Sequence, residues 1–212
     1  MIIELNQDQV RDIEAMFADF PGGAMKAVCR GINRSLETGK TLAAKEIGMR
    51  LNVTQTRIKQ DMKIDKAYPA SPVGRIDAVG RPVSLTTFTG TRKTLKGVSV
   101  NVLTTTPRVI LKHAFINYAN NALQVFWRLY KPAVRRPKNP LIKYGNNLPD
   151  KYRYEIEIRK GPRIEDIYAR PEVYGAVMAK LNSYLMDRID HEASYLLSQY
   201  QQKTYGIEFR EF

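Results

Sequence analysis

Three acidic side chains and a histidine stand close together in the stretch DRIDHEAS near the C-terminus. Asp187, Asp190 and His191 would lie on neighbouring turns of a helix, and carboxylates with an imidazole are a donor set that divalent metals accept. No cysteine or second histidine lies nearby, and acids on a long helix more often form its solvated face. The other histidine, His113, alternates with apolar residues in a predicted strand. We therefore predict a structural or surface role for both histidines and no metal site.

The remaining candidates for catalysis have structural explanations. The single cysteine, Cys29, has helical spacing with Met25 and Ile32, which favours a small core side chain over a nucleophile. Glu155 and Glu157 would share one face of a strand, where neighbouring arginines could pair with them. The sequence contains no G-x-S-x-G elbow, no Walker-type loop and no G-x-G-x-x-G fingerprint. We therefore expect a protein that is not an enzyme and that binds no cofactor.

Positive charge is concentrated in the middle third of the chain. Between Asp77 and Asp150 lie 72 residues with twelve lysines and arginines and no acid. Residues 1–77 contain 12 basic and 10 acidic side chains and residues 150–212 contain 10 and 11, so the net charge of +13 arises between them. A charge that serves solubility would be spread over the surface, whereas a local excess indicates a polyanionic partner.

We choose loop residues as the candidates for contact with this partner, because loops lie on the surface and can reach it. They are Arg92, Lys93, Lys96, Arg135, Arg136, Lys138 and Lys143. If the partner is DNA, no helix-turn-helix or zinc-finger pattern predicts base recognition, so we expect phosphate contacts that depend on salt but not on sequence. An acidic protein surface is the alternative partner. Aromatic residues lie among the charges, but Phe126 or Trp127, whichever points inward, is assigned to the core.

Apolar periodicity predicts helices at both ends of the chain. Helices are expected over residues 6–19 and 24–38 and on towards residue 52, with Gly39 either ending the second helix or bending it. A short helix with Thr54 as a candidate cap follows. From Pro171 to about Lys203 an apolar stripe predicts a helical rod of roughly 50 Å. This rod either spans the subunit or packs against copies of itself.

Alternating apolar and polar residues predict strands in the middle of the chain. They are expected near 74–79, 82–89, 96–104, 111–119 and 122–130, with a turn at Ala119–Ala122 and a further strand at Tyr152–Ile158. Helices, then antiparallel strands, then one long helix indicate an α+β fold rather than βαβ units. We predict one domain with helical residues 1–67, a strand-rich basic region 74–130, a basic proline-rich loop or arm 131–159 and a C-terminal helix 171–203.

Composition limits the cellular setting. No apolar run approaches the ~20 residues that a membrane-spanning helix needs. The N-terminus has early acids and no basic segment, so we expect no signal peptide. One cysteine allows no intrachain disulfide, which is consistent with synthesis in the cytosol. We expect a protein without a membrane contact.

Four stretches in a fixed order resemble the phage minor tail protein Z family, the tail completion proteins of lambda-like phages and prophages. The order of the four, spread over residues 24–200, is what the resemblance rests on. They are AVCRGINRSLETGKTLAAKEIGMRLNVTQTRIKQDMKIDKA (Ala27–Ala67), GRPVSLTTFTGTRKTLKGVSVNVL (Gly80–Leu103), AFINYANNALQVFWRL (Ala114–Leu129) and KGPRIEDIYARPEV (Lys160–Val173) with the helix that follows. The stretch from Lys131 to Arg159 is longer than in that family, so its role cannot be borrowed.

The resemblance implies a non-enzymatic virion component. Such a protein acts late in tail assembly and in head–tail joining, near the DNA end. Its expected partners are other tail and connector proteins and copies of itself in a ring, with possible DNA contact. Its expected location is the virion tail, and the host cytoplasm during assembly.

Two other functions remain as alternatives. A free-standing, sequence-neutral nucleic-acid-binding protein would also need a basic region. A nuclease is less well supported, because the basic region lacks the carboxylates that would bind a metal.

Overall fold

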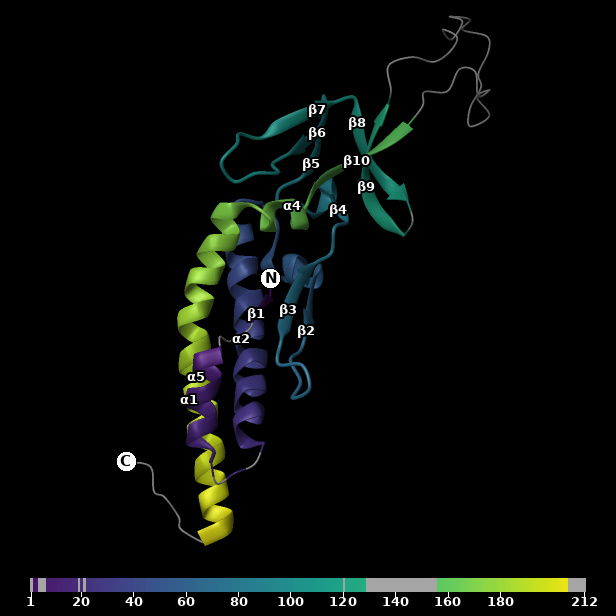
Figure 1. The fold of residues 1–212 in the computed structure, drawn as a ribbon. Coiled ribbons are helices and arrows are strands. Elements are labelled where there is room, and N and C mark those ends of the chain that lie inside the picture. Colours follow the sequence, from purple (N-terminus) through teal and green to yellow (C-terminus); the bar gives the residue numbers. More distant parts are fainter. Residues whose placement is uncertain are drawn as a thin grey trace, which may run out of the picture. The chain divides into compact units, whose positions relative to one another are not determined.

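The computed structural model describes residues 2–3, 7–18, 20, 22–119, 121–128 and 156–205 (Figure 1). Helices and strands alternate in blocks, as expected for a mixed α+β protein, so the predicted fold class is confirmed. The helices are α1 (Gln7–Met16), α2 (Gly23–Gly48), α3 (Gln55–Gln60), α4 (Ile164–Tyr168) and α5 (Pro171–Tyr205), with a 3-10 turn η1 (Leu85–Thr87). The strands are β1 (Ile2–Ile3), β2 (Met62–Asp65), β3 (Gly74–Ala78), β4 (Pro82–Ser84), β5 (Arg92–Thr94), β6 (Gly97–Val100), β7 (Val109–Lys112), β8 (Ala114–Ala119), β9 (Ala122–Arg128) and β10 (Ile156–Arg163).

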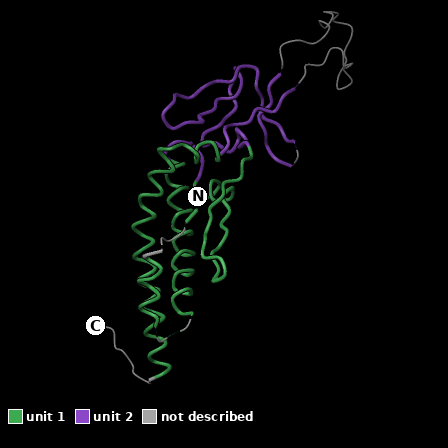
Figure 2. Tube along the Cα trace, in the orientation of Figure 1, with its two compact units in different colours: residues 1–48, 55–81, 164–212 green, residues 49–54, 82–163 purple. Residues whose placement is uncertain are grey.

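The chain folds into two compact units (Figure 2). Unit 1 contains residues 1–48, 55–81 and 164–212, and unit 2 contains residues 49–54 and 82–163. Unit 1 therefore combines both ends of the chain, and unit 2 is built almost wholly from the middle.

Unit 1 is organised by the packing of α5 on α2 (Figure 1). The predicted apolar stripe of α5 is buried and consists of Val173, Val177, Leu181, Leu185, Ile189 and Leu196. Pro171 opens this helix, at the position where its missing N–H costs nothing. On α2, Val28, Ile32 and Leu36 are buried at helical spacing. The stripe of α5 therefore packs on α2 within unit 1.

Helix α2 continues through Gly39, so the expectation that a helix ends there is wrong. The reason for the glycine is close packing. A Cβ at this position would lie 3.1 Å from Ile76 Cδ1 on β3 and 3.1 Å from Leu181 Cδ2 on α5. A small residue therefore lets one helix approach both a strand and a second helix, and the loss in helix propensity is offset by burial.

A small antiparallel sheet completes unit 1, with strand order β1-β3-β2. Its central strand β3 was predicted. This strand packs closely on α2: a Cβ added at Gly74 would lie only 2.7 Å from side-chain atoms of both Ile32 and Leu36. The flanking strands β1 and β2 were not predicted. Strand β2 pairs with β3 from Met62↔Ala78 to Asp65↔Arg75.

Unit 2 is a half-barrel of antiparallel strands. One sheet has the strand order β4-β10-β9-β8 and the other has the order β5-β6-β7. The strand predicted over 111–119 is interrupted at His113, whose φ of 62° separates β7 from β8. The prediction that His113 sits inside a strand is therefore wrong. Because the chain bends there, the continuous segment 109–119 contributes one edge strand to each sheet, β7 to one and β8 to the other.

The other predicted strands of unit 2 are mostly present with different bounds. Strand β4 ends at Ser84, where the turn η1 replaces the strand predicted to residue 89. The predicted turn between β8 and β9 is confirmed by the pairing Ala119↔Ala122 and by a φ of 58° at Asn121. Strand β10 begins at Ile156, inside the stretch assigned to a basic arm, and the remainder of that arm lies outside the described residues.

Candidate polyanion-binding surface

The two units differ sharply in charge. Unit 2 contains 17 lysines and arginines and three acids, a net charge of +14, whereas unit 1 contains 17 and 18, a net charge of −1. The basic excess recognised in the sequence thus belongs to one compact unit. A phosphate backbone or an acidic surface that approaches unit 2 meets attraction with almost no local compensation.

The described part of unit 2 contains ten basic side chains and one acid, Glu157. Glu157 lies on β10 and pairs with Arg159 at 3.4 Å between Oε2 and Nη2, as expected, whereas Glu155 lies outside the described residues. Arg159 also stacks on the indole of Trp127, with its Cζ 4.1 Å from the ring centroid. Both contacts hold Arg159 within the half-barrel wall.

Two further arginines of unit 2 have structural contacts. Arg128 lies over the ring of Phe115, with Cζ 5.0 Å from the centroid. Arg108 donates through Nη1 to the carbonyl oxygen of Gly90 and so ties two loops together. These arginines stabilise unit 2 as well as adding to its charge.

The predicted contact residues Arg92, Lys93 and Lys96 lie together on the β5–β6 hairpin. Arg92 and Lys93 are exposed on the edge strand β5, and Lys96 is exposed in the two-residue turn. Lys112 is exposed on β7 directly opposite Gly97 and adds a fourth cation, which the sequence analysis did not single out. Arg135, Arg136, Lys138 and Lys143 lie outside the described residues.

The β5–β6 hairpin belongs to a sheet whose central strand is buried. The central strand β6 is buried along Val98, Ser99 and Val100, while its neighbour β5 is exposed. The turn is closed by the pairing Thr94↔Gly97 and by a hydrogen bond that Thr94 Oγ1 donates to the Gly97 carbonyl oxygen at 2.9 Å. The hairpin and the neighbouring strand β7 therefore expose these four cations to solvent beside a buried central strand.

The half-barrel also has an open pocket of about 280 Å³ on its surface. Its lining is mainly apolar and includes Leu85, Val100, Val102, Leu111 and Trp127, together with the backbone of β10 near Arg159. Within the described chain, the buried atoms Trp127 Nε1 and Arg159 Nε have no hydrogen-bond acceptor. The pocket is slightly smaller than the range of about 300–1,000 Å³ typical of ligand sites.

Unit 1 contains the side chains first considered for metal binding. Asp187, Asp190 and His191 are all exposed on α5. Among the residues that the structure describes, no three His, Cys, Asp or Glu side chains are grouped so as to hold a metal ion. Cys29 is buried on α2, and its burial raises the pKa of the thiol, which is the opposite of what a nucleophile needs.

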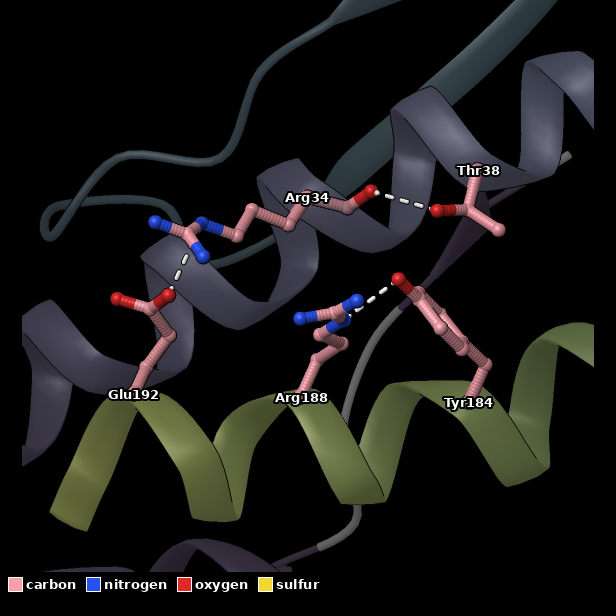
Figure 3. A network of polar contacts seen from close by, with 5 residues as sticks. All are labelled: Arg34, Thr38, Tyr184, Arg188 and Glu192. Carbon is pink, nitrogen blue, oxygen red and sulfur yellow. Dashed lines mark hydrogen bonds and ion pairs between the residues drawn. The ribbon is translucent and has the colours of Figure 1, made fainter. Parts of the chain in front are cut away.

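A polar network joins α2 to α5 within unit 1 (Figure 3). Glu192 is buried, and its Oε1 lies 2.9 Å from Arg34 Nε. One turn away, Arg188 donates through Nε to the hydroxyl oxygen of Tyr184 and lies over its ring. Hydrogen bonds from Thr38 and Arg188 and the charges of Arg188 and Arg34 lower the pKa of the Tyr184 phenol, against a smaller opposing effect of burial. The simplest role of this network is to fix the register of the two helices.

Comparison of the chain with protein-family models, with curated proteins and with solved structures finds no match. No helix within the described ranges has both the length and the apolar character of a membrane span.

Proposed function

We propose that this chain is a phage or prophage tail completion protein, a structural component without enzymatic activity that acts in tail assembly and head–tail joining near the DNA end. The separation of charge, with +14 on unit 2 and −1 on unit 1, is the observation that supports the proposal most directly. A component beside the DNA end meets phosphates of every sequence. It therefore needs a basic surface and no base-reading element.

The assignment to a tail rests on the resemblance to the minor tail protein Z family. The resembling stretches include α2 and the β4–β6 region, and they extend through β8, β9 and the start of α5. The proposed partners are other tail and connector proteins, together with copies of this chain in a ring. Because the apolar stripe of α5 already packs on α2, the ring contacts must use other surfaces, such as the exposed Tyr174 and Tyr195 on α5.

A charge-matched pair of variants tests the DNA contact. The first variant is Arg92→Gln/Lys93→Gln/Lys96→Gln in unit 2, and the control is Lys63→Gln/Lys66→Gln/Arg170→Gln, which removes three exposed charges from unit 1. Binding to duplexes of unrelated sequence is measured over a salt series. The unit 2 variant should reduce the slope of log K against log salt by about 2–3, since each phosphate contact contributes ~0.9. The control should leave the slope unchanged, and equal effects of both variants would contradict the proposal.

A second experiment separates the tail protein from a free-standing nucleic-acid-binding protein, which the same charge also favours. Purified tail tubes that lack this component are mixed with the protein and analysed by sedimentation. A tail protein binds the tubes as an oligomer and has weak affinity for free DNA. A monomer that ignores the tubes and binds free DNA with a steep salt dependence would support the alternative.

A further inference from the structure

The tip of the β5–β6 hairpin has an apolar residue where none is expected. The turn consists of Leu95 and Lys96, between the paired residues Thr94 and Gly97. Leu95 is fully exposed. Lys96 is exposed in the same turn, and Lys93 and Lys112 are exposed close to it in the sheet, on opposite faces because they pair with the consecutive residues Val98 and Gly97 of β6.

Neither the turn nor the core accounts for Leu95. Two-residue hairpin turns favour Asn, Asp and Gly, and the backbone strain of this turn falls on Gly97, whose φ is 147°. A Cβ at Gly97 would lie 2.0 Å from the Leu111 carbonyl oxygen, so the glycine is required there. Leu95 has no such requirement and makes no contribution to burial. Its whole side chain is available to a partner.

The cations have a partial structural explanation. Edge strands are commonly protected by charged side chains, and β5 is an edge strand, so Arg92 and Lys93 would prevent pairing with other chains. Edge protection does not explain Lys96, which lies in the turn, or the exposed leucine beside it. Proteins that bind the minor groove combine basic side chains with apolar residues, leucine among them, that are inserted between base steps.

We propose that the tip of the β5–β6 hairpin binds duplex DNA, with Leu95 inserted between neighbouring base pairs from the minor groove and Lys93, Lys96 and Lys112 on the flanking phosphates. This inference rests on the proposed function, because it names the nucleic acid and the mode of contact for the same basic surface. The cations supply affinity that falls with salt, and the leucine supplies unstacking that is independent of salt.

Charge and size favour DNA over a membrane or a protein at this tip. A single leucine removes too little apolar surface from water to hold a protein on a bilayer, for which even one acyl chain gives only weak binding. A protein partner would need an acidic surface with a pocket for one side chain. Duplex DNA has phosphates on both sides of every base step, and the wedge itself opens the gap at the cost of unstacking that step.

The test uses the full chain and a short duplex that contains 2-aminopurine, whose fluorescence rises when it is unstacked. Leu95→Asn suits the turn and removes the wedge, Leu95→Met retains an apolar wedge, and Leu123→Asn is the control because Leu123 is an exposed leucine next to the other hairpin turn. We expect wild type and Leu95→Met to raise the fluorescence. Leu95→Asn should abolish the rise and weaken duplex binding about tenfold without changing the salt slope. Leu123→Asn should behave as wild type, and no variant should alter heparin binding.

The outcomes separate the wedge from the proposed function. Wild-type binding without a rise in fluorescence, or equal affinities of Leu95→Asn and wild type, would overturn the wedge and leave the basic contact intact. Leu95-dependent binding to anionic phosphatidylserine vesicles or to tail tubes, with none to DNA, would assign the tip to a membrane or a protein and also overturn it. If wild type does not bind duplex DNA even at low salt, the wedge fails, and the tail-tube experiment alone decides the proposed function.

Discussion

Glu192 on α5 is a buried carboxylate that depends on one exposed partner. Its Oε1 lies 2.9 Å from Arg34 Nε, and the Arg34 side chain is more than half exposed. Removing one partner of a fully buried pair costs about 3–5 kcal/mol, because the remaining charge stays desolvated. Since water reaches this pair from the Arg34 side, we expect Arg34→Met to lower the free energy of unfolding by about 1–3 kcal/mol, as measured by chemical denaturation.

The double variant Arg34→Met/Glu192→Leu is the control for this pair. Replacing both charges by apolar side chains removes the stranded carboxylate, so most of the lost stability should return. A double variant less stable than Arg34→Met would show that Glu192 is stabilised by something other than Arg34.

The Tyr184 phenol should titrate below the ordinary pKa of tyrosine. Hydrogen bonds from Thr38 and Arg188, with the nearby guanidinium charges, lower its pKa from the ordinary value of 10.0. A lowered folded-state pKa means that the contribution to stability is present above the unfolded pKa and is lost as the pH falls through the folded one. A near-ultraviolet absorbance titration of wild type should therefore contain a phenolate that forms below the ordinary tyrosine pKa, and this ionisation should be missing in Tyr184→Phe. In Arg188→Gln the same ionisation should move to higher pH, and an unchanged curve would contradict the assignment.

Helices α2 and α5 approach each other so closely at Gly31 that no larger residue fits there without a shift. A Cβ at Gly31 would lie 2.4 Å from Ile189 Cγ1 and 3.0 Å from Ile189 Cα, and the backbone atom cannot rotate away. Helix propensity alone would make Gly31→Ala stabilising by about 1 kcal/mol, but overpacking costs about 1–3 kcal/mol. We expect a net loss of stability, read from the denaturation midpoint.

Gly175 provides the matched control on the partner helix. A Cβ there meets nothing within 4 Å, so Gly175→Ala should stabilise the protein by about 0.5–1 kcal/mol through propensity alone. If both alanine variants shift the midpoint in the same direction, close packing does not set the distance between the helices.

The same elements show what sequence patterns can and cannot predict. The stripe of α5 is visible because 3.6-residue periodicity persists over many turns, and the Ala119–Ala122 turn is visible because Asn tolerates positive φ. Strands β5 and β2 are three and four residues long, too short for an alternation to stand out. The break at His113 and the continuation of α2 through Gly39 depend on contacts with residues distant in sequence, which no local pattern contains.

For the candidate site, charge was predictable and geometry was not. The basic excess follows from counting residues, and the grouping of Arg92, Lys93 and Lys96 follows from their closeness in the chain. That Lys112 lies opposite Gly97 depends on the β6–β7 register. The exposure of Leu95 depends on which two residues form the turn. The sequence Thr-Leu-Lys-Gly does not identify them, because it would suit the interior of a strand as well as a turn.

At the level of the whole chain, the two units differ in how strongly their own charges repel one another. Their unfolding can also be followed with separate spectroscopic probes. Repulsion among like charges destabilises a compact unit, and unit 2 has a net charge of +14 against −1 on unit 1. The single tryptophan, Trp127, belongs to unit 2, whereas the long helices α2 and α5 belong to unit 1. Tryptophan fluorescence therefore reports the unfolding of unit 2, and the helical circular dichroism signal reports that of unit 1.

Salt should therefore stabilise unit 2 more than unit 1. Raising the ionic strength from low salt to about 0.5 M shortens the screening length to a few ångströms and removes most of the repulsion between exposed cations. We expect the thermal midpoint measured by tryptophan fluorescence to rise by about 5 °C, and the midpoint measured by helical circular dichroism to change by much less. Heparin at low salt should have the same selective effect, because a ligand that binds only the folded unit stabilises it. A tryptophan-fluorescence midpoint that does not rise with salt would mean that the charge of unit 2 is balanced by neighbours, and the basic surface would lose its main physical support.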